Sequence, residues 1–141
     1  MADDAGDFAR SMRIATSGLR AQAGRMRVIS ENIANADSTA PAAGGDPYRR
    51  KVPTFPSAPD RTLDAKVVTL GKVRTDTSAF RVKHEPGNPS ADAAGNVKYP
   101  NVNPLIEMTD MRDAQRSYEA NLNIISATRR MIQRTLDILK A

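Results

Sequence analysis

The 141-residue sequence contains no cysteine and no tryptophan, and it has only three phenylalanines and three tyrosines. Without cysteine, the chain has no disulfide framework and no thiolate-ligated zinc or redox site. The few aromatic side chains supply little of the bulky apolar volume that usually fills a compact core. Since no run of about 18 apolar residues occurs, the sequence predicts no lipid-spanning segment.

The sequence also lacks a secretory signal and a concentrated patch of charge. Its first ten residues, MADDAGDFAR, are acidic and have no apolar core of the kind that a cleaved signal peptide needs. The 21 basic and 16 acidic residues are mixed along the chain, and the densest basic run is residues 49–51. Nucleic-acid-binding proteins usually gather basic residues on one face or in one run, so the pattern argues against a nucleic-acid partner.

What is present falls into three sections. All nine prolines lie between positions 41 and 104. We therefore expect an N-terminal heptad helix over residues 1–35, a Pro/Gly-rich loop and short β middle section over residues 36–103, and a long C-terminal heptad helix over residues 104–141. Asn103 is a favourable N-cap and Pro104 suits the first helical position.

Both end sections carry apolar residues at alternating steps of three and four, the spacing of a heptad seam. The predicted fold class is mainly α, with the long terminal helices pairing as a coiled-coil-like hairpin beside a small, irregular, β-containing middle. The large apolar and aromatic seam residues are Met12, Leu19, Met26, Ile29, Ile33, Met108, Met111, Tyr118, Leu122, Ile125, Ile132, Leu136 and Leu139.

The middle section predicts two short strands and a long connection. Residues 64–75 and 79–84 are β-branched and alternating, so we expect two strands joined near residues 76–78. The following twenty or so residues, up to Pro104, are punctuated by Pro, Gly and Asn. A connection of this length is usually a binding loop or a disordered linker.

The sequence offers no catalytic or metal-binding constellation. His84 is the only histidine, and we interpret it as a surface residue on a short strand. Gly71 and Lys72 are not preceded by the glycine that a Walker A motif requires. Asp110 and Asp113 lie three apart on one helical face, which we interpret as favourable charge near a helix N-terminus. The sequence therefore predicts no enzyme, no cofactor and no metal.

Several segments resemble a known family. SGLRAQAGRMRVISENIANADST, residues 17–39, is similar to the N-terminal signature of the flagellar basal-body rod and hook proteins. PYRRK (47–51), PGNPSADAAGNVKYPNVN (86–103) and EMTDMRDAQRSYEANLNIISATRRM (107–131) resemble the proximal-rod member of that family. The resemblance implies a structural subunit of the rod, the drive shaft through the bacterial cell envelope. Such subunits pair their terminal helices and stack helically around a central export channel.

The resemblance also implies partners, a location and an interface. The expected partners are copies of the chain, other rod subunits, base and ring components of the basal body, and the flagellar type III export apparatus. The expected location is the flagellar basal body, spanning the periplasm, after export without a cleaved signal peptide. We expect the seam residues, with Asn32 and Asn35, to form the subunit interface. Replacing Ile125 or Leu136 by Asp should then abolish assembly.

Asn32 and Asn35 lie in the segment SENIANADST, residues 30–39, where we expect the first helix to end and the chain to turn. Asparagine side chains satisfy freed backbone groups and tolerate left-handed geometry. An ordinary Asn cap would explain these two residues but not the full segment.

Two other function classes remain open from the residues alone. A soluble coiled-coil adaptor or chaperone of a secretion system would be stably folded with a discrete oligomeric state, whereas a rod subunit should be loosely folded alone. A nucleic-acid binder would lose affinity steeply with salt.

Overall fold

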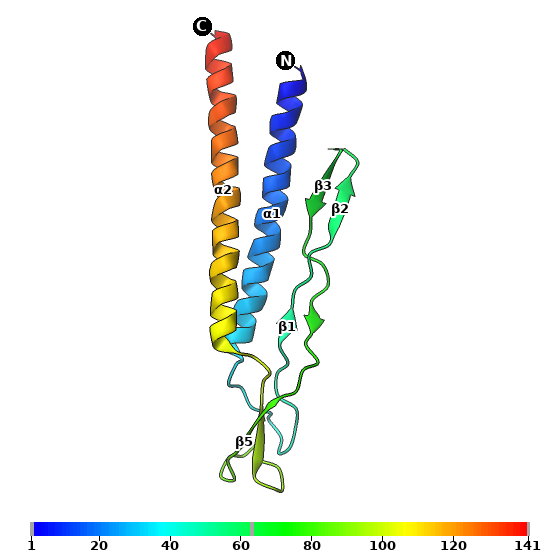
Figure 1. Cartoon of the computed structure of the whole chain (residues 1–141), viewed down its shortest axis with the longest axis vertical. Coiled ribbons are helices and arrows are strands. Elements are labelled where there is room, and N and C mark those ends of the chain that lie inside the picture. The colour runs from blue at the N-terminus through cyan, green and yellow to red at the C-terminus, as the bar shows by residue number, and fades with distance from the viewer. Residues whose placement is uncertain (1, 63, 141) are drawn as a thin grey trace. The chain divides into compact units, whose positions relative to one another are not determined.

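A computed structural model describes residues 2–62 and 64–140 of the chain. In these residues two long helices, α1 (Ala2–Ala34) and α2 (Pro104–Lys140), flank six short strands along the sequence (Figure 1). The predicted architecture of two long terminal helices and a small β-containing middle is therefore confirmed. None of the described helices is long and apolar enough to cross a membrane.

The start of α2 follows from its first residues. Asn103 caps the helix, because the Leu105 amide donates to Asn103 Oδ1 at 3.1 Å and the Glu107 amide donates to the Asn103 carbonyl at 3.1 Å. Pro104 occupies the first helical position, where its missing N–H has no helical acceptor to satisfy. The N-cap prediction is confirmed.

The end of α1 uses Asn35 in the predicted way. Its Nδ2 donates to the Glu31 carbonyl at 2.8 Å and so satisfies one acceptor of the last turn. The left-handed geometry that asparagine tolerates is not used, since Asp64, with φ of 46°, is the one non-glycine residue with positive φ in the described part of the chain. Asn32, by contrast, directs its amide away from the helix end and into the middle section.

The strands form three separate antiparallel pairs. The pairs are β1 (Lys51–Val52) with β4 (Arg74–Thr75), β2 (Ser57–Asp60) with β3 (Ala65–Val68), and β5 (Arg81–His84) with β6 (Asn96–Tyr99).

This pairing differs from the expected two strands. The segment 64–75 is divided into β3 and β4, which pair with different upstream strands. The expected long loop contains β6, because a turn that ends at Gly95, with φ of 78°, brings the chain back beside β5. Left-handed backbone of this kind favours glycine. His84 lies exposed on β5, as predicted.

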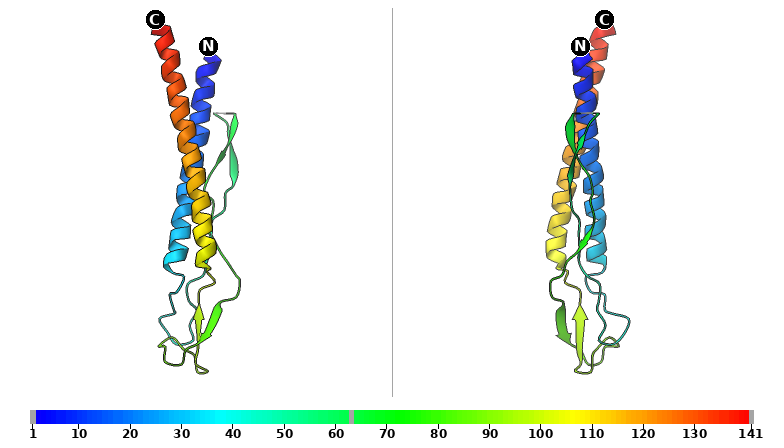
Figure 2. Two further views of the ribbon diagram at one scale, coloured as in Figure 1. Left: turned by 60° about the vertical axis from the view of Figure 1, so that its left-hand side comes forward. Right: turned by 90° about the vertical axis from the view of Figure 1, so that its right-hand side faces the viewer.

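The chain divides into two compact units, and each unit draws on both helices. The first unit comprises Met1–Arg25, Thr54–Gly71 and Asp113–Ala141. In this unit the β2–β3 hairpin lies beside α1, and the chain's two terminal segments lie at the same end of the unit (Figures 1 and 2).

The second unit comprises Met26–Pro53 and Lys72–Arg112. It holds the β1–β4 and β5–β6 pairs, the last turns of α1 and the first turns of α2. Its buried apolar side chains include Val28, Ile29, Val97 and Val102. Asn32 and Glu107 are buried as well, and each residue is only 1% exposed.

Candidate assembly interface

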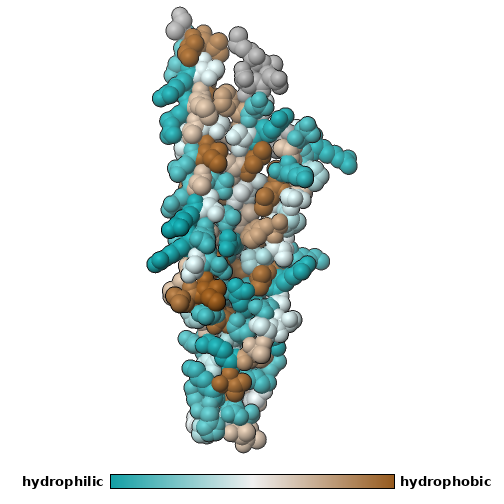
Figure 3. All heavy atoms as spheres, viewed as in Figure 1, coloured by the Kyte–Doolittle hydropathy of each residue, from teal (hydrophilic) through white to brown (hydrophobic). Residues whose placement is uncertain are grey.

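α2 presents large apolar side chains to solvent along most of its length. Leu122 is 42% exposed, Leu136 44% and Leu139 62%. The space-filling view shows a group of strongly apolar side chains over the start of α2 and further groups between charged side chains (Figure 3). The other exposed large apolar residues of this helix are Leu105, Ile106, Met108, Ile124, Met131 and Ile138. Such a series on one helix is typical of a surface that binds other chains.

The structure places the predicted interface residues in three classes of exposure. Ile29 and Asn32 are buried. Exposed are Met108, Leu122, Leu136 and Leu139. Half-buried are Met12, Leu19, Met26, Ile33, Asn35, Met111, Tyr118, Ile125 and Ile132.

The side of α2 that is buried within the chain is lined by smaller and more polar residues than the seam. Ala114 is completely buried and Thr128 is 2% exposed. Asn121 lies against Gly18 of α1, so close that a Cβ added to this glycine would be 2.8 Å from Asn121 Nδ2. A search of the sequence for large apolar residues does not find these three residues of α2. The only sequence signal for them is the seven-residue spacing of Ala114, Asn121 and Thr128.

Asn32 is the centre of a polar junction, by which we mean Asn32, Tyr48, Arg50, Lys51 and Glu107. Its Nδ2 donates to the Lys51 carbonyl at 2.8 Å and to Glu107 Oε2 at 3.0 Å. Its Oδ1 accepts from the Tyr48 hydroxyl at 2.8 Å and from the Lys51 amide at 2.9 Å. Both amide protons and both lone pairs of one buried side chain are therefore used.

Glu107 brings α2 into the same junction. Its Oε1 accepts from Arg50 Nε at 2.6 Å, and its Oε2 accepts from Asn32. Arg50 also lies 3.7 Å from Asp76 and 3.7 Å from Asp110, so its charge is shared among three carboxylates. Glu107 lies in the first turn of α2, shortly before Asp110 and Asp113, and residue type alone indicates only favourable charge near the helix start. No sequence signal indicates its burial.

The other two members of the junction extend it to the end of α1. Lys51 forms an ion pair with Glu31 one turn of helix before Asn35. Burial, and then the negative charges of Glu31 and Glu107, raise the pKa of Tyr48 from the ordinary 10.0 to about 12. The Tyr48 hydroxyl therefore remains a hydrogen-bond donor above pH 10, where an ordinary tyrosine ionises. The segment PYRRK, which holds the densest basic run and resembles the rod family, thus connects the last turns of α1 to the first turns of α2.

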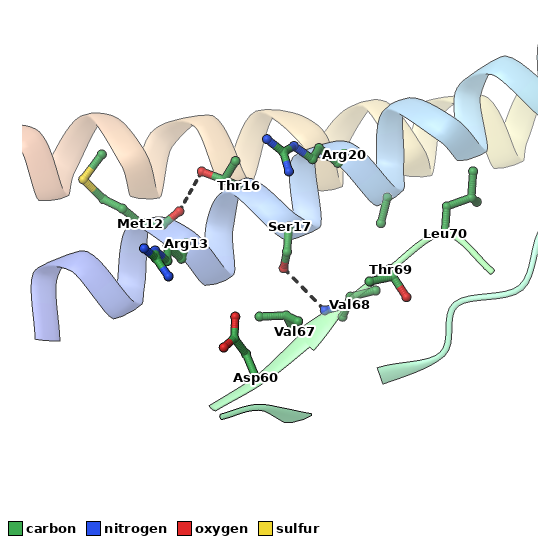
Figure 4. Close-up of a pocket in the computed structure, with 11 residues that line it drawn as sticks. Met12, Arg13, Thr16, Ser17, Arg20, Asp60, Val67, Val68, Thr69 and Leu70 are labelled. Carbon is green, nitrogen blue, oxygen red and sulfur yellow. Dashed lines mark hydrogen bonds between the residues drawn. The ribbon is translucent and has the colours of Figure 1, made fainter. Parts of the chain in front are cut away.

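In the first unit an open groove of about 630 Å³ lies between α1 and the β2–β3 hairpin (Figure 4). Met12, Ala21, Val67 and Leu70 contribute apolar surface to it. The hairpin is attached to α1 by a hydrogen bond of 3.4 Å from the Val68 amide to Ser17 Oγ. This hydrogen bond holds the hairpin along α1, and the groove is the space that remains between the two.

Within the described residues no group of three or more His, Asp or Glu side chains is arranged to hold a metal ion. The arrangement offers polar groups that fasten segments of the chain to one another and apolar groups that face outward.

Comparison with known proteins finds similarity to flagellar rod proteins over most of the chain. Residues 12–40 match the family described as flagella basal body rod protein, and residues 93–138 match the flagellar basal body rod FlgEFG protein C-terminal family. The chain is 52% identical to flagellar basal-body rod protein FlgC of Agrobacterium fabrum, over 92% of this chain and 93% of that protein. It is 40% identical to FlgC of Salmonella typhimurium over 89% and 92% of the two chains. Identity to FlgC of Aquifex aeolicus is 35% over 95% and 98%.

Proposed function

The chain belongs to the flagellar basal-body rod protein family and is a structural subunit of the rod, and from this premise we propose how it assembles. α1 and α2 pair lengthwise in a coiled-coil-like hairpin, and the outward side of this hairpin binds neighbouring subunits of the proximal rod. The helical sections 1–35 and 104–141 are the assembly elements, and section 36–103 fastens them together.

One observation supports this proposal above the others, namely the large apolar residues that α2 exposes in the isolated chain. Ile124, Leu122, Met131 and Leu136 are each at least 42% exposed. Fully burying a side chain of this size contributes about 1.5–3 kcal/mol, so burying the exposed part of one of these residues contributes roughly 0.6–1.4 kcal/mol. Contacts from several such residues on each subunit are therefore needed to offset the cost of association.

The interface residues proposed for these contacts are the seam residues, and the exposed ones among them are available without any rearrangement. Met108, Leu122, Leu136 and Leu139 contact a neighbouring subunit directly in this proposal. In this proposal the outward side of α2 contacts a different surface of the neighbouring subunit. Such a heterologous contact that does not close produces a helical stack, which here encloses the export channel and transmits torque as a drive shaft.

The same proposal gives the partners and the location. The chain contacts copies of itself, other rod subunits, and the base and ring components of the basal body. It reaches its place in the periplasm through the flagellar type III export apparatus without a cleaved signal peptide. Its role is mechanical, without an enzymatic activity. The similarity to the three FlgC proteins gives no support to the adaptor or chaperone alternative.

The test is incorporation of a charged variant into rods. Leu136→Asp places a charge in the proposed contact without disturbing a buried position, since Leu136 is 44% exposed. Cells that make only this variant should lack complete rods and should not swim. The matched control is Val82→Asp on β5, where the side chain is 60% exposed and lies outside both helices. Normal incorporation of Leu136→Asp would contradict the proposed contact.

A further inference from the structure

Two contacts between α1 and α2 have the same antiparallel register. In the first unit Gly18 lies against Asn121, and in the second unit Asn32 donates to Glu107 at 3.0 Å. Gly18 and Asn32 are 14 residues apart on α1, and Glu107 and Asn121 are 14 residues apart on α2. Each unit therefore pairs its own parts of the two helices with the same antiparallel numbering.

The fully buried residues along the contact of α1 with α2 in the first unit are small, and they do little to fix this alignment. Paired helices usually hold their register by inserting large side chains into holes on the partner. Here the contact holds Ala15 at 3% exposure, Ala114 at 0% and the bare backbone of Gly18. The large apolar residues of α2 mostly face outward. A slide of one helix along the other by one turn changes little in the burial of these small side chains.

The polar junction resists the slide. One turn is about 5.4 Å of helix, which is enough to break the bond from Asn32 to Glu107 and the bond from Arg50 to Glu107 at 2.6 Å. Glu107, 1% exposed, would then be a buried charge without its cation. An unpaired buried charge is strongly unfavourable, so every slipped alignment is disfavoured.

We propose that Asn32, Arg50 and Glu107 are positioning residues that set the register of α1 against α2. Asn32 and Glu107 are each 1% exposed in the isolated chain. The three residues act by fixing where the outward apolar residues of the two helices stand relative to one another, which determines the surface that a neighbour binds. This inference rests on the proposed lengthwise pairing of the helices.

The absence of cysteine from the chain makes register measurable by engineered disulfides. Gly18→Cys with Asn121→Cys reports the native alignment. Gln22→Cys with Asn121→Cys, and Ala15→Cys with Asn121→Cys, report slips in the two directions. Positions 15 and 22 lie about 4.5 and 6 Å along α1 from Gly18, and a disulfide requires Cα atoms within about 7 Å. The measurement is the fraction of full-length chain that becomes cross-linked under oxidation.

The decisive comparison measures these cross-links in a chain that also carries Arg50→Met and Glu107→Met. Replacing a buried ion pair by apolar residues is often neutral or stabilising, whereas Asn32 loses the acceptor of one amide proton, so the melting temperature should change little. The ratio of native to slipped cross-links should nevertheless fall about tenfold, because the polar selection of register is gone. A merely stabilising pair would lower the melting temperature and leave the ratio unchanged. Glu107→Gln, which keeps the size and removes the charge, is the second variant if the first does not fold.

The control is Asp46→Met with Lys98→Met, which removes an exposed ion pair of 2.9 Å in the same unit. Its cross-linking ratio should equal that of the unsubstituted chain. An unchanged ratio in the variants at Arg50 and Glu107 would overturn the register inference and leave helix pairing intact. Failure of the Gly18 and Asn121 pair to cross-link in the unsubstituted background would instead contradict the pairing itself.

Discussion

Asn32 and Asn35 stand three residues apart in the sequence but have different tasks. Asn35 caps the end of α1 through one bond to the Glu31 carbonyl. Asn32 is buried and makes four bonds to Tyr48, Lys51 and Glu107. Residue type and spacing predict the cap, because capping is local. They do not predict the junction, because its partners are 16 to 75 residues away in the chain.

The difference gives a prediction for stability. Asn32→Ala leaves the half-buried Tyr48 hydroxyl and Lys51 amide and the buried Glu107 carboxylate short of a partner, and should lower the free energy of unfolding by about 2–4 kcal/mol. Asn35→Ala removes one half-exposed bond and should lower it by about 0.5–1 kcal/mol. Urea unfolding followed by circular dichroism measures both. Equal losses for the two variants would contradict the central place of Asn32.

Tyr48 gives a prediction for pH. Its pKa is raised to about 12 in the folded chain, mainly by burial, from an ordinary value of 10.0. Between these values the unfolded chain releases the phenol proton while the folded chain keeps it. The free energy of unfolding therefore falls as pH rises from 10 to 12.

Urea unfolding at several pH values in this window measures the slope. Tyr48→Phe cannot ionise, so its free energy of unfolding should start lower, because the bond to Asn32 is lost, but should fall less steeply over the window. The same slope in the two proteins would show that Tyr48 is not the group responsible.

At the scale of elements, the helices were predictable and the strands were only partly so. Asn103 and Pro104 mark the start of α2 by local chemistry, and both act as expected. The strands are two to four residues long and pair with segments that no sequence pattern connects. Sequence reasoning predicts loop at β6, because Pro, Gly and Asn surround its four residues.

The contact of the β2–β3 hairpin with α1 gives an element-scale prediction. A Cβ on Gly24 would be 2.5 Å from Leu70 Cδ2, so Gly24→Ala must move the Leu70 side chain where it packs against α1. Alanine also raises the helix propensity of α1 by about 0.5–1 kcal/mol, so we expect the free energy of unfolding to fall by no more than about 1 kcal/mol. We expect the Val68 amide, which donates to Ser17 Oγ, to exchange faster with solvent.

Hydrogen exchange measured by NMR reads the effect at that amide. Adding Leu70→Ala to Gly24→Ala makes room for the new methyl group and should restore part of the protection that Gly24→Ala removes. Full protection of the Val68 amide in Gly24→Ala alone would contradict the close packing.

For the whole molecule, periodicity found the right elements but could not tell which chain their apolar residues face. Half-buried residues such as Met111 and Ile125 lie next to the line that α2 buries within the chain, while Leu122 and Leu136 are exposed. A heptad search selects large residues and so passes over Ala114 and Thr128 on that line. Burial within a chain and burial between chains leave the same signature in one sequence.

The most direct test of the rod assignment is mass spectrometry of purified hook–basal bodies from cells that make this chain. We predict that the chain is present in quantity in intact basal bodies, and that its peptide of residues 1–10 is recovered uncleaved apart from loss of the initiating Met. Absence of the chain from intact basal bodies would contradict the assignment to the rod.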